Sequence, residues 1–104
     1  MEINWQAHHA VISPRLKSRA EASVDRMARR LGGAVGATVR FEREGTRCRV
    51  ELLLRARRRV LVAEGEGRYY GPALAMATSH LERQVTSLRR TAKERAARAA
   101  GGRA

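Results

Sequence analysis

The sequence has little of several residue types that give small proteins stability or chemistry. Among its 104 residues there is one cysteine, Cys48, and only four aromatic residues. A single cysteine cannot form an internal disulfide, so nothing requires an oxidising compartment. No apolar run is long enough to span a bilayer, and residues 1–5 lack the charged-then-apolar pattern of a secretory signal. We therefore expect a cytoplasmic protein that does not bind membranes.

Groups that support catalysis or metal binding are also missing. His8 and His9 are adjacent and project in different directions, and no further His or Cys stands at ligand spacing. Residues 65–67, Gly-Glu-Gly, are too short a signal for a nucleotide-binding loop. No nucleophile with a matching base is recognisable, and Cys48 lies in the inward register of a predicted strand. We expect no enzyme, no metal and no cofactor.

Positive charge is abundant. There are 22 Lys and Arg residues against 10 Asp and Glu, a net charge of +12, and only two of the cations are lysine. Such an excess makes the folded chain repel itself and favours an anionic partner. Nucleic acid is the commonest such partner, with an anionic membrane surface as the rival. Arginine binds phosphate through two parallel hydrogen bonds, which favours nucleic acid.

The order of elements predicts an α+β fold. Alternating apolar residues indicate strands near residues 3–5, 37–42, 48–56 and 60–66. A helix begins after Ser13 and ends at Gly32-Gly33, and a second begins at Gly71-Pro72. The result is β-α-β-β-β-α, a four-stranded mixed sheet with both helices packed on one face and the first two strands parallel. We place Trp5 and Phe41 in the core, and Tyr69 and Tyr70 outside it.

The chain divides near residue 90. After Leu88 no large apolar side chain is left to pack on the sheet, and the composition becomes rich in Ala and Arg. We therefore predict a folded domain over residues 1–90 and a basic tail over residues 91–104 that frays or is disordered.

The cations of the first helix gather on one side. At 100° per residue its apolar residues share one arc, and five arginines fall on an adjacent arc of about 100°. Glu21 and Asp25 lie opposite, and Lys17 on their side can pair with Glu21. Like charges four residues apart are unfavourable, which favours a binding stripe over a merely solvated face. The arginines are Arg15, Arg19, Arg26, Arg29 and Arg30.

Two further cationic groups follow. In the second helix Arg83 and Arg90 lie opposite the apolar face, with Lys93 nearby and Arg89 closer to the core. Arg55 and the turn Arg57–Arg59 between the last two strands are either a further contact or a solubilising hairpin tip. With so few aromatics, a sheet that stacks RNA bases is not expected, so phosphates and RNA shape are the better target.

Four short motifs resemble one known family. They are Glu2-Ile3-Asn4, Ile12–Lys17, Val60–Gly67 and Leu81-Glu82-Arg83-Gln84-Val85, and their order and spacing match over about residues 1–93. In these the chain resembles the ribosome hibernation-promoting factors, also described as sigma-54 modulation proteins. It departs from the family's pattern at Arg68, where an acid is common, and at His80 and Ser87, where Lys is common.

The resemblance implies a fold similar to double-stranded-RNA-binding domains and a function in translation. Such a protein would occupy the mRNA/tRNA channel of the small ribosomal subunit through rRNA contacts and keep ribosomes inactive in stationary phase or stress. Its partners would be the small subunit, its rRNA and a separate ribosome-dimerising factor. As a short form it would be a monomer off the ribosome and would not pair ribosomes by itself. The RNA-binding residues expected from the wheel and the resemblance are Arg15, Lys17, Arg19, Arg26, Arg29, Arg30, Arg83, Arg89, Arg90 and Lys93.

Two other functions remain compatible with the residues. One is a general binding module for structured RNA or DNA, which would bind any duplex with the same steep salt dependence. The other is a protein-binding modulator of transcription, whose charge serves an acidic protein surface.

Overall fold

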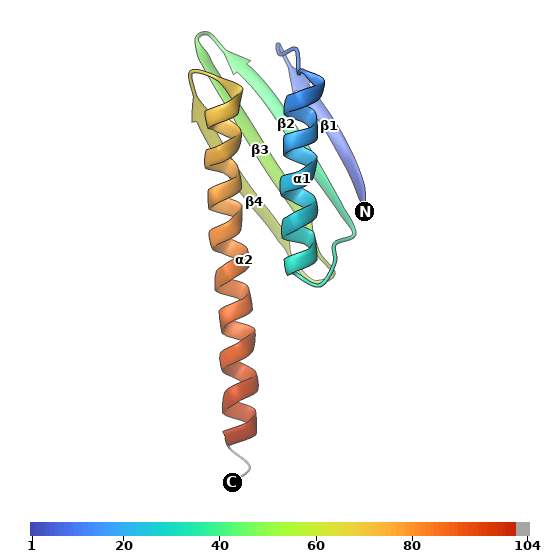
Figure 1. Ribbon diagram of the computed structural model, residues 1–104, viewed down its shortest axis with the longest axis vertical. Coiled ribbons are helices and arrows are strands. Elements are labelled where there is room, and N and C mark those ends of the chain that lie inside the picture. The colour runs from blue at the N-terminus through green and yellow to red at the C-terminus, as the bar shows by residue number, and fades with distance from the viewer. Residues whose placement is uncertain (102–104) are drawn as a thin grey trace.

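A computed structural model describes residues 1–101 of the protein (Figure 1). Four strands form one sheet, and two helices lie on one of its faces. The elements in chain order are β1 (Glu2–His8), α1 (Pro14–Arg30), β2 (Gly36–Glu44), β3 (Arg47–Arg55), β4 (Val60–Gly67) and α2 (Tyr70–Gly101).

The sheet follows the chain order, β1-β2-β3-β4. β1 and β2 are parallel, with Trp5 opposite Val39, while β2, β3 and β4 pair antiparallel through two short turns. The single parallel pair follows from α1, because a helical crossover brings the next strand back in the same direction. The predicted α+β class and β-α-β-β-β-α order are confirmed.

Local sequence signals fix both ends of α1. The Ser13 hydroxyl accepts a hydrogen bond from the Leu16 N–H at 3.2 Å, and Pro14 occupies the first helical position. At the other end Gly32 and Gly33 adopt φ values of +81° and +121°. These conformations suit glycine, and they let the Gly33 N–H donate to the Ala28 carbonyl at 2.8 Å.

The core lies between the sheet and the helices. Alternate strand residues point toward the helices, so that Val39, Phe41, Val50, Leu52 and Leu54 are almost fully buried. The helices contribute apolar residues spaced by three and four, as a single buried stripe requires. These are Leu16, Ala20, Val24 and Met27 from α1 and Leu74, Ala77, Leu81 and Val85 from α2.

One aromatic assignment from sequence was wrong. Trp5 and Phe41 do stack, with ring centroids 6.5 Å apart, but Tyr70 also packs edge-on against Phe41 at 5.8 Å. Tyr70 begins α2 one residue before the Gly71-Pro72 pair, and this turns its ring inward. Burial raises the pKa of the Tyr70 phenol. Tyr69 is exposed as expected.

α2 approaches β4 very closely at Gly65. A Cβ atom on Gly65 would overlap the Ala73 carbonyl oxygen and would lie 2.6 Å from the Ala77 nitrogen. Two alanines on the helix and a glycine on the strand therefore let the two backbones touch. This contact sets the position of α2 on the sheet.

α2 continues well beyond the sheet. Leu88 is its last partly buried apolar residue, and residues 89–101 are helical with every side chain exposed (Figure 1). Residues 89–101 can continue the helix because Ala and Arg are strong helix formers, which extend a helix without needing packing. The division of the chain at residue 90 stays a prediction, and residues 102–104 lie outside the described residues. Neither helix, within the described part, has the length and apolar character to cross a membrane.

We expect Gly65→Ala to lower the free energy of unfolding by about 3 kcal/mol or more, because the added methyl group must push α2 away from the sheet. Chemical denaturation of the purified variant measures this. Gly67→Ala is the matched control, since its Cβ would meet only ordinary contacts at 3.6 Å and beyond. Equal stability of the two variants would contradict the close approach.

Candidate nucleic-acid interface

The arginines of α1 share one side of the helix, next to α2. Because the apolar stripe faces the sheet, the adjacent arc turns toward α2 and solvent, while Glu21 and Asp25 turn toward β1. Four of the five arginines are exposed and Arg30 is half-buried. We call Arg15, Arg19, Arg26, Arg29 and Arg30 the α1 cations.

Two of the α1 cations are held by α2. The helices run side by side in the same direction (Figure 1), and Ser23 meets Thr78 with their hydroxyls 3.2 Å apart. Further along, Arg26 lies 3.7 Å from the carboxylate of Glu82, and Arg30 donates to the hydroxyl of Thr86 at 3.0 Å. Both arginines are thereby positioned over the line where the helices meet.

The other α1 cations keep their charge free. Arg29 donates only to the carbonyl of Asp25 in its own helix, and Arg15 and Arg19 form no ion pair within residues 1–101. An exposed guanidinium without a carboxylate partner retains its full attraction for phosphate.

Lys17 is placed differently from the expectation. Its ammonium group lies 5.0 Å from the centre of the Trp5 ring instead of pairing with Glu21. Trp5 projects from β1 under the flank of α1, and the attraction of a cation for an aromatic face holds the lysine there. Lys17 is therefore on the β1 side of α1, away from the α1 cations.

The predicted cations of α2 are spread along its length. Arg83 lines a shallow groove with Leu61 of β4 and with Leu88, so it lies on the side of α2 remote from α1. Arg89, Arg90 and Lys93 lie beyond the sheet and are exposed. The structure thus groups the α1 cations but does not bring Arg83 or Lys17 next to them.

The open face of the sheet, which no helix covers, is also charged but balanced. Arg47 and Glu66 lie 2.7 Å apart, as do Arg49 and Glu64, and Arg40 lies 3.6 Å from Glu42. The hydrogen bond from Arg49 lowers the pKa of the Glu64 carboxyl and raises that of the guanidinium. On this face each of these cations has a carboxylate to neutralise it.

Two thirds of the protein's net charge of +12 belongs to its two helices. α1 and α2 contain twelve Lys and Arg residues and four Asp and Glu residues, a net charge of +8. The four strands contain five arginines and six glutamates, a net charge of −1. The helical side of the molecule can therefore attract a polyanion, whereas the strands of the sheet carry no excess of positive charge.

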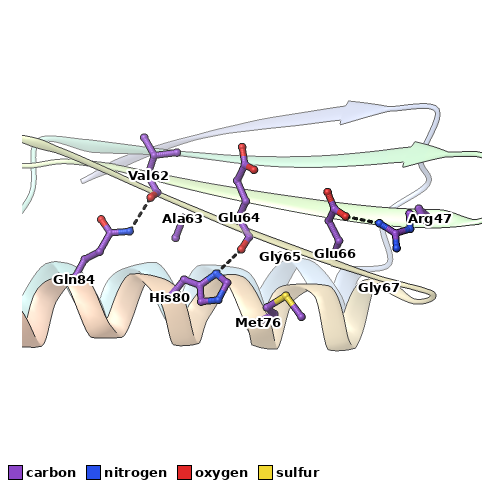
Figure 2. Close-up of a pocket in the computed structure, with 10 residues that line it drawn as sticks. All are labelled: Arg47, Val62, Ala63, Glu64, Gly65, Glu66, Gly67, Met76, His80 and Gln84. Atoms are coloured by element: carbon purple, nitrogen blue, oxygen red, sulfur yellow. Dashed lines mark hydrogen bonds and ion pairs between the residues drawn. The ribbon is translucent and has the colours of Figure 1, made fainter.

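Sequence reasoning missed the role of two side chains at the edge of the sheet. A groove of 740 Å³ runs between β4 and α2, and Figure 2 shows the two α2 residues that span it. His80 Nδ1 lies 2.8 Å from the carbonyl oxygen of Glu64, and Gln84 Nε2 donates to that of Val62 at 2.8 Å. The sequence signal that could have revealed this role is the spacing of His80 and Gln84, two polar residues four positions apart beside the apolar stripe of α2.

This groove offers no chemistry of its own. Its polar groups are engaged, since Arg47 pairs with Glu66 while His80 and Gln84 bind backbone carbonyls. Within residues 1–101 no three His, Cys, Asp or Glu residues are grouped to hold a metal ion. Among residues 1–101, the cationic surface formed by the helices is therefore the better candidate for a binding site.

Comparison with known proteins identifies similar chains. The family described as sigma-54 modulation protein / S30EA ribosomal protein matches residues 3–93. No curated protein matches the chain by sequence.

Two solved structures share the fold. A ribosomal subunit interface protein from Coxiella burnetii has a TM-score of 0.77 at 17% identity, covering 86% of this chain and 98% of its own. The N-terminal domain of Protein Y from Thermus thermophilus has a TM-score of 0.73 at 23% identity, covering 85% of this chain and 99% of its own.

The ion pairs on the open face of the sheet predict that the stability of the protein depends on pH. Because Arg49 lowers the folded-state pKa of Glu64, the pair contributes stability above the unfolded-state pKa of Glu64 and loses it as the pH falls through the folded-state value. Both groups are about 40% exposed, so Glu64→Gln should lower the free energy of unfolding at pH 7 by less than about 1 kcal/mol. The difference from wild type should vanish in acid, where Glu64 is protonated.

Denaturation at neutral and acid pH checks this, with Glu44→Gln as the control at an exposed end of β2. A difference between Glu64→Gln and wild type that persists unchanged in acid would contradict the ion pair.

Proposed function

Because the chain belongs to the sigma-54 modulation protein / S30EA ribosomal protein family, we propose that it is a ribosome-binding inhibitor of translation. It acts by binding and not by catalysis. The surface formed by α1 and α2 binds rRNA of the small ribosomal subunit, in the cytoplasm. By occupying the mRNA/tRNA channel it keeps ribosomes inactive in stationary phase or stress.

The observation that carries this proposal is the division of charge, +8 on the helices against −1 on the strands. A chain that needed positive charge only for solubility would gain nothing from collecting it on one side. Ribosomal RNA presents phosphates over a broad, rigid surface, and such a surface matches a cationic face held by a packed core.

The cations of this face have different tasks. Arg15, Arg19 and Arg29 bind phosphate directly, since no carboxylate competes for them. Arg26 and Arg30 are positioned by Glu82 and Thr86, and each has further donors to offer. The remaining contacts at the edges of the surface come from Lys17, Arg83, Arg89, Arg90 and Lys93.

Inhibition then requires only that the site is filled. A bound domain excludes mRNA and tRNA from the channel by its volume, and no residue has to perform a chemical step. The protein is a monomer off the ribosome, and a separate factor pairs ribosomes where pairing occurs.

Neutralising the free α1 cations tests the surface. Arg15→Gln/Arg19→Gln/Arg29→Gln should weaken binding to isolated small subunits about 1,000-fold, if each arginine contributes about 1.4 kcal/mol through a charged hydrogen bond. Co-sedimentation measures the affinity, and circular dichroism verifies that the helices remain.

The matched control is Arg43→Gln/Arg47→Gln/Arg49→Gln, which removes the same charge from the β2–β3 hairpin. It should bind like wild type apart from a small uniform loss. If the two triple variants weaken binding equally, net charge and not the helix surface governs association.

Salt dependence separates this function from general nucleic-acid binding. We expect saturable binding of one protein per small subunit that survives salt concentrations able to strip the protein from bulk RNA duplex. A surface that fits its ligand adds contacts that do not depend on counterion release. Binding through charge alone has no such contacts and is lost as the salt concentration rises.

Equal loss from small subunits, RNA duplex and DNA duplex would instead indicate a general binding module. Binding to a partner that persists after nuclease treatment would favour a protein-binding transcription modulator.

A further inference from the structure

Cations from three segments converge where α2 leaves the sheet. α1 ends there with Arg29 and Arg30, and the Val35 N–H binds the Arg55 carbonyl at 2.7 Å, which brings the end of β3 to the same place. Leu61 at the start of β4 lines a groove with Leu88 of α2. The turn between β3 and β4 therefore lies beside the point at which α2 loses contact with the sheet (Figure 1).

The turn itself carries three consecutive arginines, Arg57–Arg59, which we call the basic turn. A backbone hydrogen bond from Ala56 to Arg59, 2.9 Å long, closes it, so the three side chains are held outward and exposed. None of the three forms an ion pair within the described residues. Arg47 and Arg49 of β3 are paired with glutamates, whereas the basic turn joins Arg55, at the end of β3, in a cluster that is unpaired within residues 1–101.

The second component is the free end of α2, residues 89–101, which we call the overhang. It extends roughly 20 Å at 1.5 Å per residue and has no apolar side chain larger than alanine. Its five cations are Arg89, Arg90, Lys93, Arg95 and Arg98, against one acid, Glu94. At 100° per residue no sector wider than about 120° lacks a cation.

A helix with cations on every side suits few partners. Its one cation-free sector holds only Ala92, Ala96 and Ala99, whose methyl groups offer little apolar area to a protein partner or a membrane surface. A single nucleic-acid strand would lie on one side and leave the cations of the other side unneutralised. Two phosphate backbones that face each other would neutralise the whole circumference.

We propose that the overhang inserts between two facing RNA backbones, and that the basic turn binds the outer side of one of them. This inference rests on the proposed function for the identity of the polyanion, but the site is separate from the α1 cations. The major groove of regular A-form RNA is too narrow for a helix. The ligand is therefore RNA whose groove is widened by an internal loop, or two RNA helices packed together.

Two variants test the components. Lys93→Gln/Arg95→Gln/Arg98→Gln alters the overhang, and Arg57→Gln/Arg58→Gln/Arg59→Gln alters the basic turn. The probes are isolated small subunits, a synthetic RNA duplex with an asymmetric internal loop, a fully paired RNA duplex and a DNA duplex. Each variant should weaken binding to small subunits and to looped RNA at least tenfold. Each should also lower the slope of log affinity against log salt by about 2 to 3.

The Arg43→Gln/Arg47→Gln/Arg49→Gln protein is the control for both and should keep the wild-type slope. Unchanged slopes in the overhang and turn variants would overturn the proposal, as would equal preference for looped and fully paired RNA. Equal binding to anionic lipid vesicles would overturn it in favour of a membrane surface. A third outcome separates the two proposals: wild type binds looped RNA but not ribosomes, and the overhang and turn variants lose the binding to looped RNA. This outcome would refute the proposed function and leave the RNA site proposed here intact.

Directed cleavage tests the geometry. Ala97→Cys on the overhang and Val60→Cys beside the basic turn can each carry a tethered hydroxyl-radical source, while the buried Cys48 gives wild type as the unlabelled background. On looped RNA, Ala97→Cys should cleave two segments on opposite strands, and Val60→Cys should cleave only one of these two. A single cleaved segment from Ala97→Cys, or a Val60→Cys site outside both, would contradict insertion between two backbones.

Discussion

The arrangement of this protein depends on the contact of one strand backbone with one helix backbone at Gly65. The contact needs no side chain on the strand and only methyl groups on the helix. It fixes the distance between α2 and the sheet, and Phe41, Leu74 and Leu81 then fill the core at that distance. The direction of α2, and with it the position of the five cations of the overhang, follows from where this contact holds the first turns of the helix.

Electrostatics would oppose folding if the charges were distributed evenly, since +12 on a chain of this size repels itself. The structure reduces this cost on the sheet, where glutamates pair with Arg40, Arg47 and Arg49. On the helices the repulsion between cations remains, since Glu82 is the one carboxylate of α1 and α2 that forms an ion pair with an α1 arginine. An anionic partner that neutralises these cations also relieves their mutual repulsion, so binding stabilises the fold that presents them.

Most of the fold could be predicted from the sequence because periodicity is a local property. Leu16, Ala20, Val24 and Met27 reveal a helix stripe without knowledge of its partner, and Val50, Leu52 and Leu54 reveal a strand in the same way. The starts of both helices, and the gathering of the α1 cations on one side of α1, could be predicted from the same local patterns. The particular contacts could not be predicted, because they depend on which elements become neighbours in space.

Lys17 illustrates this limit. Its sequence neighbour Glu21 offered a pairing within the helix, but Trp5, twelve residues earlier, lies closer to it once β1 pairs with β2. Tyr70 was misplaced and the role of His80 was missed for the same reason, since their partners are on β2 and β4. The length of α2 could not be predicted for another reason, because a helix made of strong helix formers does not end where its packing ends.

The bonds from His80 and Gln84 to β4 have a consequence for the protein in concentrated solution. β4 is an edge strand, and its outward carbonyls would otherwise be free to pair with a strand of another molecule. Since side chains of α2 already occupy the carbonyls of Val62 and Glu64, growth of the sheet from one copy to the next is blocked along this border. The side chains of His80 and Gln84 thus form an intramolecular cap that opposes strand pairing between copies at β4.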